Sequence, residues 1–88
     1  MKQLIVQSSF DRDWKRLTPD IQEKVRTHLF ALQTLTFPFR GLQIAKLSGM
    51  KQKLFRLRVG EYRIIFAFDA SSVILFAIGH RKDVYRGV

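Results

Sequence analysis

The sequence predicts an α+β domain: an N-terminal strand, a two-helix hairpin and then an antiparallel β-meander. Three observations support this fold class. Apolar residues recur every three to four positions through residues 8–35, strand-like alternation lies on both sides of Gly60, and a polar turn at residues 69–72 separates two apolar runs. Helices and strands that are segregated along the chain are typical of α+β domains. We expect about four strands, with the helices on one face of the sheet.

The first half of the chain contains the helix signals. Residues 4–6 form a short apolar run that predicts the first strand. Ser8 and Asp11 have the spacing of a capping box, which places a helix start at Ser8. Thr18 followed by Pro19 predicts the N-cap and first position of a second helix. Its apolar stripe consists of Ile21, Val25, Leu29 and Leu32.

The second half contains the strand signals. Residues 37–41, Phe-Pro-Phe-Arg-Gly, interrupt the helical pattern and predict a loop. After this loop we expect a strand over residues 45–46 that leads into 53–59, followed by strands over 62–68 and 73–79. Polar residues fill the turn between the last two strands, as turns require.

Charge and composition restrict the class of protein. With 88 residues the chain forms one domain, 1–88, and its 47% hydrophobic content and eight Phe predict a packed core. The formal net charge of +9 favours encounter with polyanions. Nucleic acid, ribosome, acidic protein and anionic membrane surface all fit that charge.

Metal, disulfide and membrane functions are not expected. The chain contains no Cys, and its two histidines, His28 and His80, are far apart in sequence. We therefore expect no metal and no cofactor. The apolar run near the start is too short for a signal peptide or a membrane span, so we expect a cytoplasmic protein with no membrane partner.

The hairpin around Gly60 gathers positive charge on one face. A two-residue turn at residues 60–61 would place Arg58 directly opposite Arg63. Strand alternation then puts Arg56 on the same face and the apolar residues on the other. Like charges opposed across a strand pair destabilise a sheet, commonly by about 0.2–1 kcal/mol. This face therefore predicts an anion-binding site, with a merely solvated charged surface as the alternative.

The last two strands determine where His80 lies. A four-residue turn between them would pair Phe68 with Val73. Ile64 would then pair with Ala77, and the same parity places His80 on the face of the three arginines. One residue more or less in the register would reverse that assignment, because strand side chains alternate with a period of two.

The C-terminal tail adds Arg81, Lys82 and Tyr85 beside the end of the last strand. Guanidinium groups bind phosphate through paired hydrogen bonds. A tyrosine ring stacks on an unpaired base, which contributes roughly 1–3 kcal/mol, although Tyr85 could instead pack the tail against the core. Together with the face that contains Arg56, Arg58 and Arg63, these groups are suited to binding single-stranded RNA and to cleaving it through its own 2′-hydroxyl without a metal.

Two motifs, Arg-Leu-Arg-Val-Gly-Glu-Tyr-Arg-Ile-Ile-Phe at 56–66 and Ile-Gly-His-Arg-Lys-Asp-Val-Tyr at 78–85, give the chain a family resemblance. Over nearly its whole length it resembles the RelE/ParE superfamily of bacterial and archaeal toxins, and its RelE branch in particular. The resemblance implies the toxin of a type II toxin–antitoxin system, a ribosome-dependent endoribonuclease that cuts messenger RNA in the decoding site. It also implies a cognate antitoxin, in a hetero-oligomer that binds operator DNA through the antitoxin.

The resemblance also implies residue roles. Arg63 would stabilise the scissile phosphate, Arg81 would assist the leaving group, and Tyr85 would position or stack on the substrate. Arg56 and Arg58 match a basic pair on the preceding strand, with Arg56 in the catalytic set.

The general base is left open by the residues themselves. The family pattern has Lys-x-Lys where this chain has Leu54-Phe55-Arg56, and an arginine is always protonated. Lys53, His80 and Arg58 are candidates for catalysis or positioning. Strict alternation would turn Lys53 toward the core unless the strand starts later, and histidine is the residue type best suited to proton transfer near neutral pH. The further contacts that we expect with RNA are made by Lys51, Arg58 and Lys82.

Two other functions fit the same sequence. A ParE-like inhibitor of DNA gyrase would share the fold; the missing Lys-x-Lys favours it and the Gly-His-Arg-x-x-x-Tyr motif argues against it. A non-catalytic RNA-binding module would bind RNA in a salt-sensitive way without arresting growth.

Overall fold

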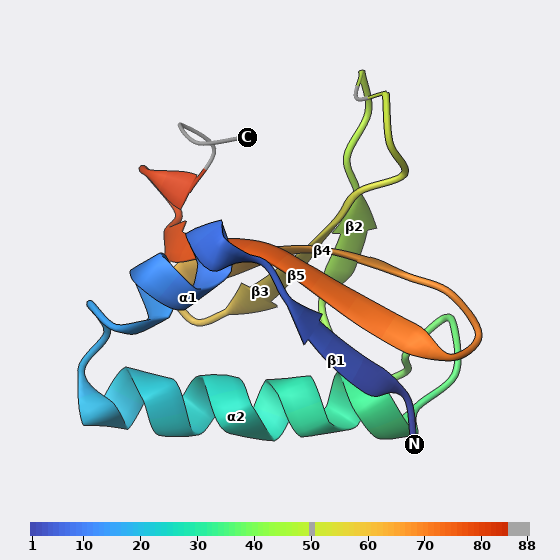
Figure 1. The fold of residues 1–88 in the computed structure, drawn as a ribbon, viewed down its shortest axis with the longest axis horizontal. Coiled ribbons are helices and arrows are strands. Elements are labelled where there is room, and N and C mark those ends of the chain that lie inside the picture. Colours follow the sequence, from blue (N-terminus) through green and yellow to red (C-terminus); the bar gives the residue numbers. More distant parts are fainter. Residues whose placement is uncertain (50, 85–88) are drawn as a thin grey trace.

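The computed structural model describes residues 1–49 and 51–84. One strand and two helices precede four further strands (Figure 1). The elements are β1 (Gln3–Val6), α1 (Ser8–Trp14), α2 (Pro19–Thr34), β2 (Ile44–Lys46), β3 (Phe55–Val59), β4 (Tyr62–Phe68) and β5 (Ser72–His80).

The five strands form one mixed sheet in the order β1-β5-β4-β3-β2. β1 runs parallel to β5, and the other neighbours are antiparallel. The predicted α+β class and element order are confirmed. The expected count of about four strands is one too few, because β2 does not continue into β3. The chain instead reverses between them, so that Lys46 pairs with Phe55 in a hairpin of its own.

Both helices begin where the sequence predicts, at Ser8 and Pro19, but the N-cap of α1 differs from the prediction. α2 begins at Pro19 with Thr18 as N-cap, as the sequence predicts. α1 has Gln7 as N-cap, so the expected capping box at Ser8 is wrong. The reason is that the Gln7 amide makes a sheet hydrogen bond to the Leu75 carbonyl (3.0 Å), and the Gln7 carbonyl accepts from the Asp11 amide (3.1 Å). The chain therefore passes from strand to helix with only Gln7 between them.

The main core lies between α2 and one face of the sheet, and Phe10 of α1 contributes to it. Val25, Leu29 and Leu32 of the predicted stripe are buried. The predicted loop over 37–41 is present, but it contributes a fully buried ring, because Phe39 adopts a positive φ of 59° that turns its side chain inward. Because the main core covers this face of the sheet, a binding site on the sheet would lie on the opposite face.

The β3–β4 register agrees with the prediction, with Arg58 opposite Arg63. The β4–β5 register does not. It begins as expected at Phe68 and Val73, but a β-bulge opposite Ile65 and Phe66 inserts one residue of β5. Ile64 consequently pairs with Ile78 instead of Ala77.

The bulge moves His80 to the other face. After it, Tyr62 pairs with His80 and Arg63 pairs with Gly79. A bulge leaves one extra residue in one strand, so every later side chain of that strand changes face relative to unbroken alternation. The prediction that His80 shares the face of the arginines is therefore wrong, and Gly79 occupies that position.

Candidate functional site

The arginine face, defined here by Arg56, Arg58 and Arg63, lies on the side of the sheet away from the main core. The register aligns Arg58 of β3 with Arg63 of β4, and Arg56 is two residues from Arg58 along β3. Arg56 and Arg63 are half-buried and Arg58 is exposed. Together with Gln43, Ile44 and Ala45, these arginines line a shallow depression of about 320 Å³.

Small residues surround the arginines on the neighbouring strands. Ala45 of β2 is opposite Arg56, and Gly79 of β5 is opposite Arg63. Because these side chains are short, the guanidinium groups are accessible from solvent between them. Two or more guanidinium groups beside such an open depression form a binding surface for phosphate oxygens.

Carbonyl oxygens of the β3–β4 turn hold Arg63. Its Nη1 donates to the Gly60 carbonyl at 2.8 Å and to the Tyr62 carbonyl at 2.9 Å. These contacts fix the guanidinium at the end of the hairpin without neutralising its charge. Both contacts use Nη1, and a guanidinium carries five N–H donors, so the role of Arg63 at a phosphate stays a prediction.

Arg81 is brought to the same turn by Glu61. The Arg81 amide donates to the Glu61 carbonyl at 2.8 Å, and its Nε donates to Glu61 Oε2 at 2.9 Å. Arg63 and Arg81 are therefore both anchored to residues 60–62. The sequence places Arg81 only near a strand end; its attachment to the turn depends on Glu61, a residue to which the sequence analysis gave no role.

A small apolar cluster closes the other end of the arginine face. Leu54, Ile65, Ala77 and Val84 are buried in it, with Leu47, Ala67 and Phe76 packed around them. The chain after β5 turns across this face, and Val84 Cα lies 3.6 Å from the point that a Gly79 Cβ would occupy. The sequence did not indicate this cluster, because Ile65 shares a strand face with Arg63 and the bulge changes which β5 residue lies opposite it.

His80 lies apart from the arginine face. Its ring meets the Tyr62 ring edge-on at 6.0 Å, and its Nδ1 accepts a hydrogen bond from the Lys82 amide at 3.2 Å. Both rings line a pocket of about 330 Å³ beside α1, together with Arg12, Asp13 and Arg16. The structure thus gives His80 the position of a cap for the turn that contains Arg81.

The two predicted lysines lie far from the β3–β4 turn. Lys51 and Lys53 are exposed in the β2–β3 loop, which projects beyond the sheet (Figure 1). The strand expected over residues 53–59 starts later, at Phe55, so strict alternation does not extend to Lys53 and this residue is exposed. At about 3.3 Å per residue, Lys53 is about 16 Å from Arg58 along the chain direction. Lys82 is exposed after β5, and Tyr85 lies outside the described residues.

Other site chemistries have little support in residues 1–49 and 51–84. Within that part of the chain there is no group of three His, Cys, Asp or Glu side chains that could hold a metal ion. None of the helices described there is long and apolar enough to cross a membrane. Amide hydrogen bonds from Ser71 and then Ser72 hold the pKa of Asp69 below its usual value, but this carboxylate belongs to the β4–β5 turn.

Comparison with solved structures identifies the fold. A RelE–RelB complex from Pyrococcus horikoshii OT3 superposes with a TM-score of 0.75 at 16% identity, covering 93% of this chain and 97% of the other. The toxin–antitoxin complex RelBE2 from Mycobacterium tuberculosis gives 0.73 at 24% identity, with 93% of both chains covered. A RelB–RelE complex from Methanococcus jannaschii gives 0.68 at 23% identity, covering 89% of this chain and 91% of the other. No curated protein sequence matches the chain.

The shared fold and the arginine face define a small α+β toxin of the RelE/ParE class. The family model for the ParE toxin of type II toxin–antitoxin systems, parDE, matches residues 4–85. The chain therefore belongs to the ParE toxin family, within the RelE/ParE superfamily of type II toxins.

Proposed function

We propose that this toxin is an endoribonuclease that cuts messenger RNA in the ribosomal decoding site, using the arginine face as its catalytic surface. The observation that supports the proposal is that Arg63 and Arg81 are both anchored to the β3–β4 turn. Carbonyls hold the Arg63 guanidinium on the face of Arg56 and Arg58, and the Glu61 carboxylate holds that of Arg81. Such an arrangement is suited to a phosphodiester and not to a neutral ligand.

The reaction needs three events at one phosphodiester. The 2′-hydroxyl loses its proton and its oxygen attacks phosphorus, so that a 2′,3′-cyclic phosphate forms and the 5′-oxygen leaves with a proton. Arg63 would stabilise the extra negative charge on the phosphorane, and Arg81 would stabilise the leaving oxygen. Arg56 and Arg58 would hold the flanking phosphates. In the proposal, Tyr85 and Lys82 contact the substrate next to Arg81.

The first proton transfer is assigned to none of the arginines. Arg56 stays protonated and cannot accept a proton. His80 contacts Tyr62 and the Lys82 amide and is remote from the depression. Lys51 and Lys53 are at the opposite end of β3, where they would contact RNA that extends along the β2–β3 loop. Bringing either lysine to the 2′-hydroxyl would require the ribosome-bound RNA to follow β3.

A cognate antitoxin is part of the proposal. The solved relatives are complexes of RelE-type toxins with RelB-type antitoxins. A chain with a net charge of +9 suits an acidic partner that covers the arginine face until the toxin is released in the cytoplasm. We propose a toxin–antitoxin hetero-oligomer in which the antitoxin contacts operator DNA. Loss of the growth arrest on co-expression with the antitoxin would test this partnership.

Induction in cells tests the proposed activity. The toxin is expressed from a tight promoter, and the 5′ ends of messenger fragments are mapped with and without translation. The expected result is growth arrest with new 5′ ends within translated codons, lost in Arg63→Ala and Arg81→Ala. Lys15→Ala is a matched control, because it removes one positive charge that is paired with Asp11 on α1. Arrest and cleavage that persist in Arg63→Ala would refute the assignment.

A second candidate is a ParE-like inhibitor of DNA gyrase. The family model that matches the chain is that of the ParE toxin, and the two lysines lie outside β3. Under this hypothesis, induction produces gyrase-dependent DNA breaks while messenger RNA stays intact. A non-catalytic RNA-binding protein would give neither breaks nor cleavage, and its RNA affinity would fall steeply with salt.

A further inference from the structure

A second groove runs beside the arginine face, between α2 and the β3–β4 turn. It has a volume of about 270 Å³ and is lined by His28, Gly41, Gln43, Arg58 and Gly60. Arg58 and Gln43 also line the depression on the arginine face. The two hollows therefore share a wall, and a chain that leaves one at Arg58 enters the other.

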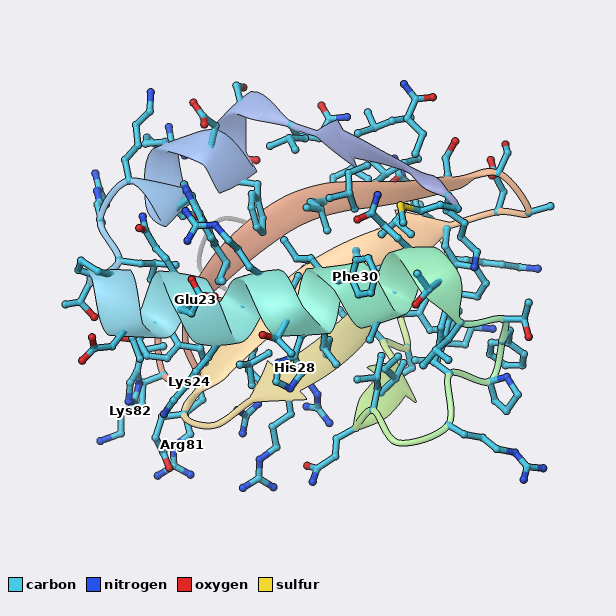
Figure 2. All side chains as sticks on the ribbon, turned by 90° about the horizontal axis from the view of Figure 1, so that it is seen from below. Glu23, Lys24, His28, Phe30, Arg81 and Lys82 are labelled. Carbon is cyan, nitrogen blue, oxygen red and sulfur yellow. The ribbon has the colours of Figure 1, made fainter. Side chains whose placement is uncertain are left out.

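On the α2 side His28 lines this groove, and Lys24 lies one helical turn before it. His28 Nδ1 lies 2.8 Å from the Lys24 carbonyl, so this nitrogen is the donor and Nε2 is left for another partner. Figure 2 shows Lys24 and His28 leaving α2 toward the side of the molecule where Arg81 and Lys82 project, whereas Phe30 points elsewhere. Glu23 is paired with Arg26 at 3.3 Å, so it does not offset the charge of Lys24.

We propose that this groove, with Lys24 and His28, is a second phosphate-binding site that takes the backbone of the RNA strand leaving the arginine face. The inference rests on the proposed function only in that the arginine face binds RNA. No Phe, Tyr or Trp is among the described residues that line the groove, and its charged or ionisable side chains are those of Arg58 and His28. The groove therefore binds phosphate in a sequence-independent way and extends the footprint of the site.

The residues that line the groove favour nucleic acid over an acidic protein as its ligand. Stable protein interfaces have an apolar core, usually with aromatic residues. The groove offers two glycines, a glutamine, an arginine and a histidine instead. Arg58 of β3 lines the groove with His28, and Lys24 lies one turn before His28 on α2. Arg58 and Lys24 are both cationic, so the charge beside the groove favours an anion.

Fluorescence anisotropy of labelled 2′-O-methyl RNA, which the toxin cannot cleave, tests the proposal on the full chain. Oligonucleotides of about 4 and about 16 nucleotides bracket the footprint of a small single-strand-binding domain. Lys24→Ala should weaken binding of the long strand about two- to fivefold, as expected for one exposed charge contact. It should also lower the slope of log affinity against log salt by about 0.7. The short strand should bind as before.

A neutral substitution isolates His28. His28→Gln keeps a polar side chain in the groove but removes the imidazole, so it should weaken binding of the long strand and leave the short strand bound as before. The charge-matched Lys15→Ala should leave the difference between the long and short strands unchanged.

The outcomes separate this inference from the proposed function. Loss of binding of both strands in Arg63→Ala, with a long-strand defect in Lys24→Ala and His28→Gln, supports both. A defect in Arg63→Ala together with wild-type binding of the long strand in Lys24→Ala and His28→Gln overturns the second site alone. Unchanged binding of both strands in Arg63→Ala overturns the RNA-binding face, and the second site with it.

Discussion

Substitutions of Glu61 separate the position of Arg81 from its charge. Glu61 holds Arg81 through two contacts, a backbone hydrogen bond of 2.8 Å and a side-chain pair of 2.9 Å. Glu61→Gln keeps an acceptor oxygen for Arg81 Nε but removes the negative charge. Glu61→Ala removes the acceptor as well, while the backbone contact is retained in both variants.

The structure limits the size of these effects. The two side chains are 54% and 61% exposed, so solvent screens the pair and its removal should change the free energy of unfolding by less than about 1 kcal/mol. If Arg81 must stay at the turn to assist the leaving oxygen, Glu61→Ala should slow cleavage about fivefold, the rate equivalent of about 1 kcal/mol. Glu61→Gln should cleave nearly as fast as the wild type.

The affinity for RNA should rise in both variants, in contrast to the cleavage rate. Both variants add one unit of net positive charge beside the arginine face, so both should bind RNA more tightly at low salt. The assay combines cleavage on translating ribosomes, anisotropy with uncleavable RNA and chemical denaturation. Equal cleavage rates for Glu61→Ala and Glu61→Gln would refute the view that this contact positions Arg81, as would a loss of several kcal/mol of stability in either variant.

Variants at three further positions test the fold around the site. Phe66→Ala removes a fully buried ring and should lower the free energy of unfolding by about 3–5 kcal/mol in denaturant titrations, whereas unchanged stability would contradict the described core. Gly79→Ala should be tolerated, because its Cβ would meet Val84 at 3.6–3.8 Å. Gly79→Ile should displace the turn that follows β5 and slow cleavage without unfolding the sheet. Equal cleavage rates for the two variants would contradict the described position of that turn. The stabilisation that Asp69 gains from the Ser71 and Ser72 amides should be present above pH 3.8 and should be lost as pH falls through the lowered pKa of Asp69. Thermal melts over this pH range should show the loss in the wild type and not in Asp69→Ala.

The β3–β4 hairpin could be predicted from sequence because a two-residue turn leaves one register. Val59 and Tyr62 border Gly60 and Glu61, so the opposition of Arg58 and Arg63 follows from alternation alone. The start of α2 could also be predicted, because it depends only on nearby residues: Thr18, Pro19 and the apolar spacing that follows.

The position of His80 could not be predicted because it depends on a bulge. The extra residue of β5 lies where α1 contacts the strand edge, and Ser9 Oγ donates to the Phe76 carbonyl at 2.5 Å. No turn signal in the sequence marks such a point. The contact between Arg81 and Glu61 could not be predicted either, because it joins the β3–β4 turn to the chain after β5, across the ends of two strands. Long-range contacts of this kind become visible only when the register is known.

Cleavage of messenger RNA on purified ribosomes tests the central claim most directly. With a defined messenger and a vacant decoding site, the toxin should produce one cut within the exposed codon, and none when ribosomes are left out. Arg63→Ala and Arg81→Ala should lose the cut, and Lys15→Ala should keep it. An intact messenger with wild-type toxin, or an equal cut with Arg63→Ala, would contradict the account.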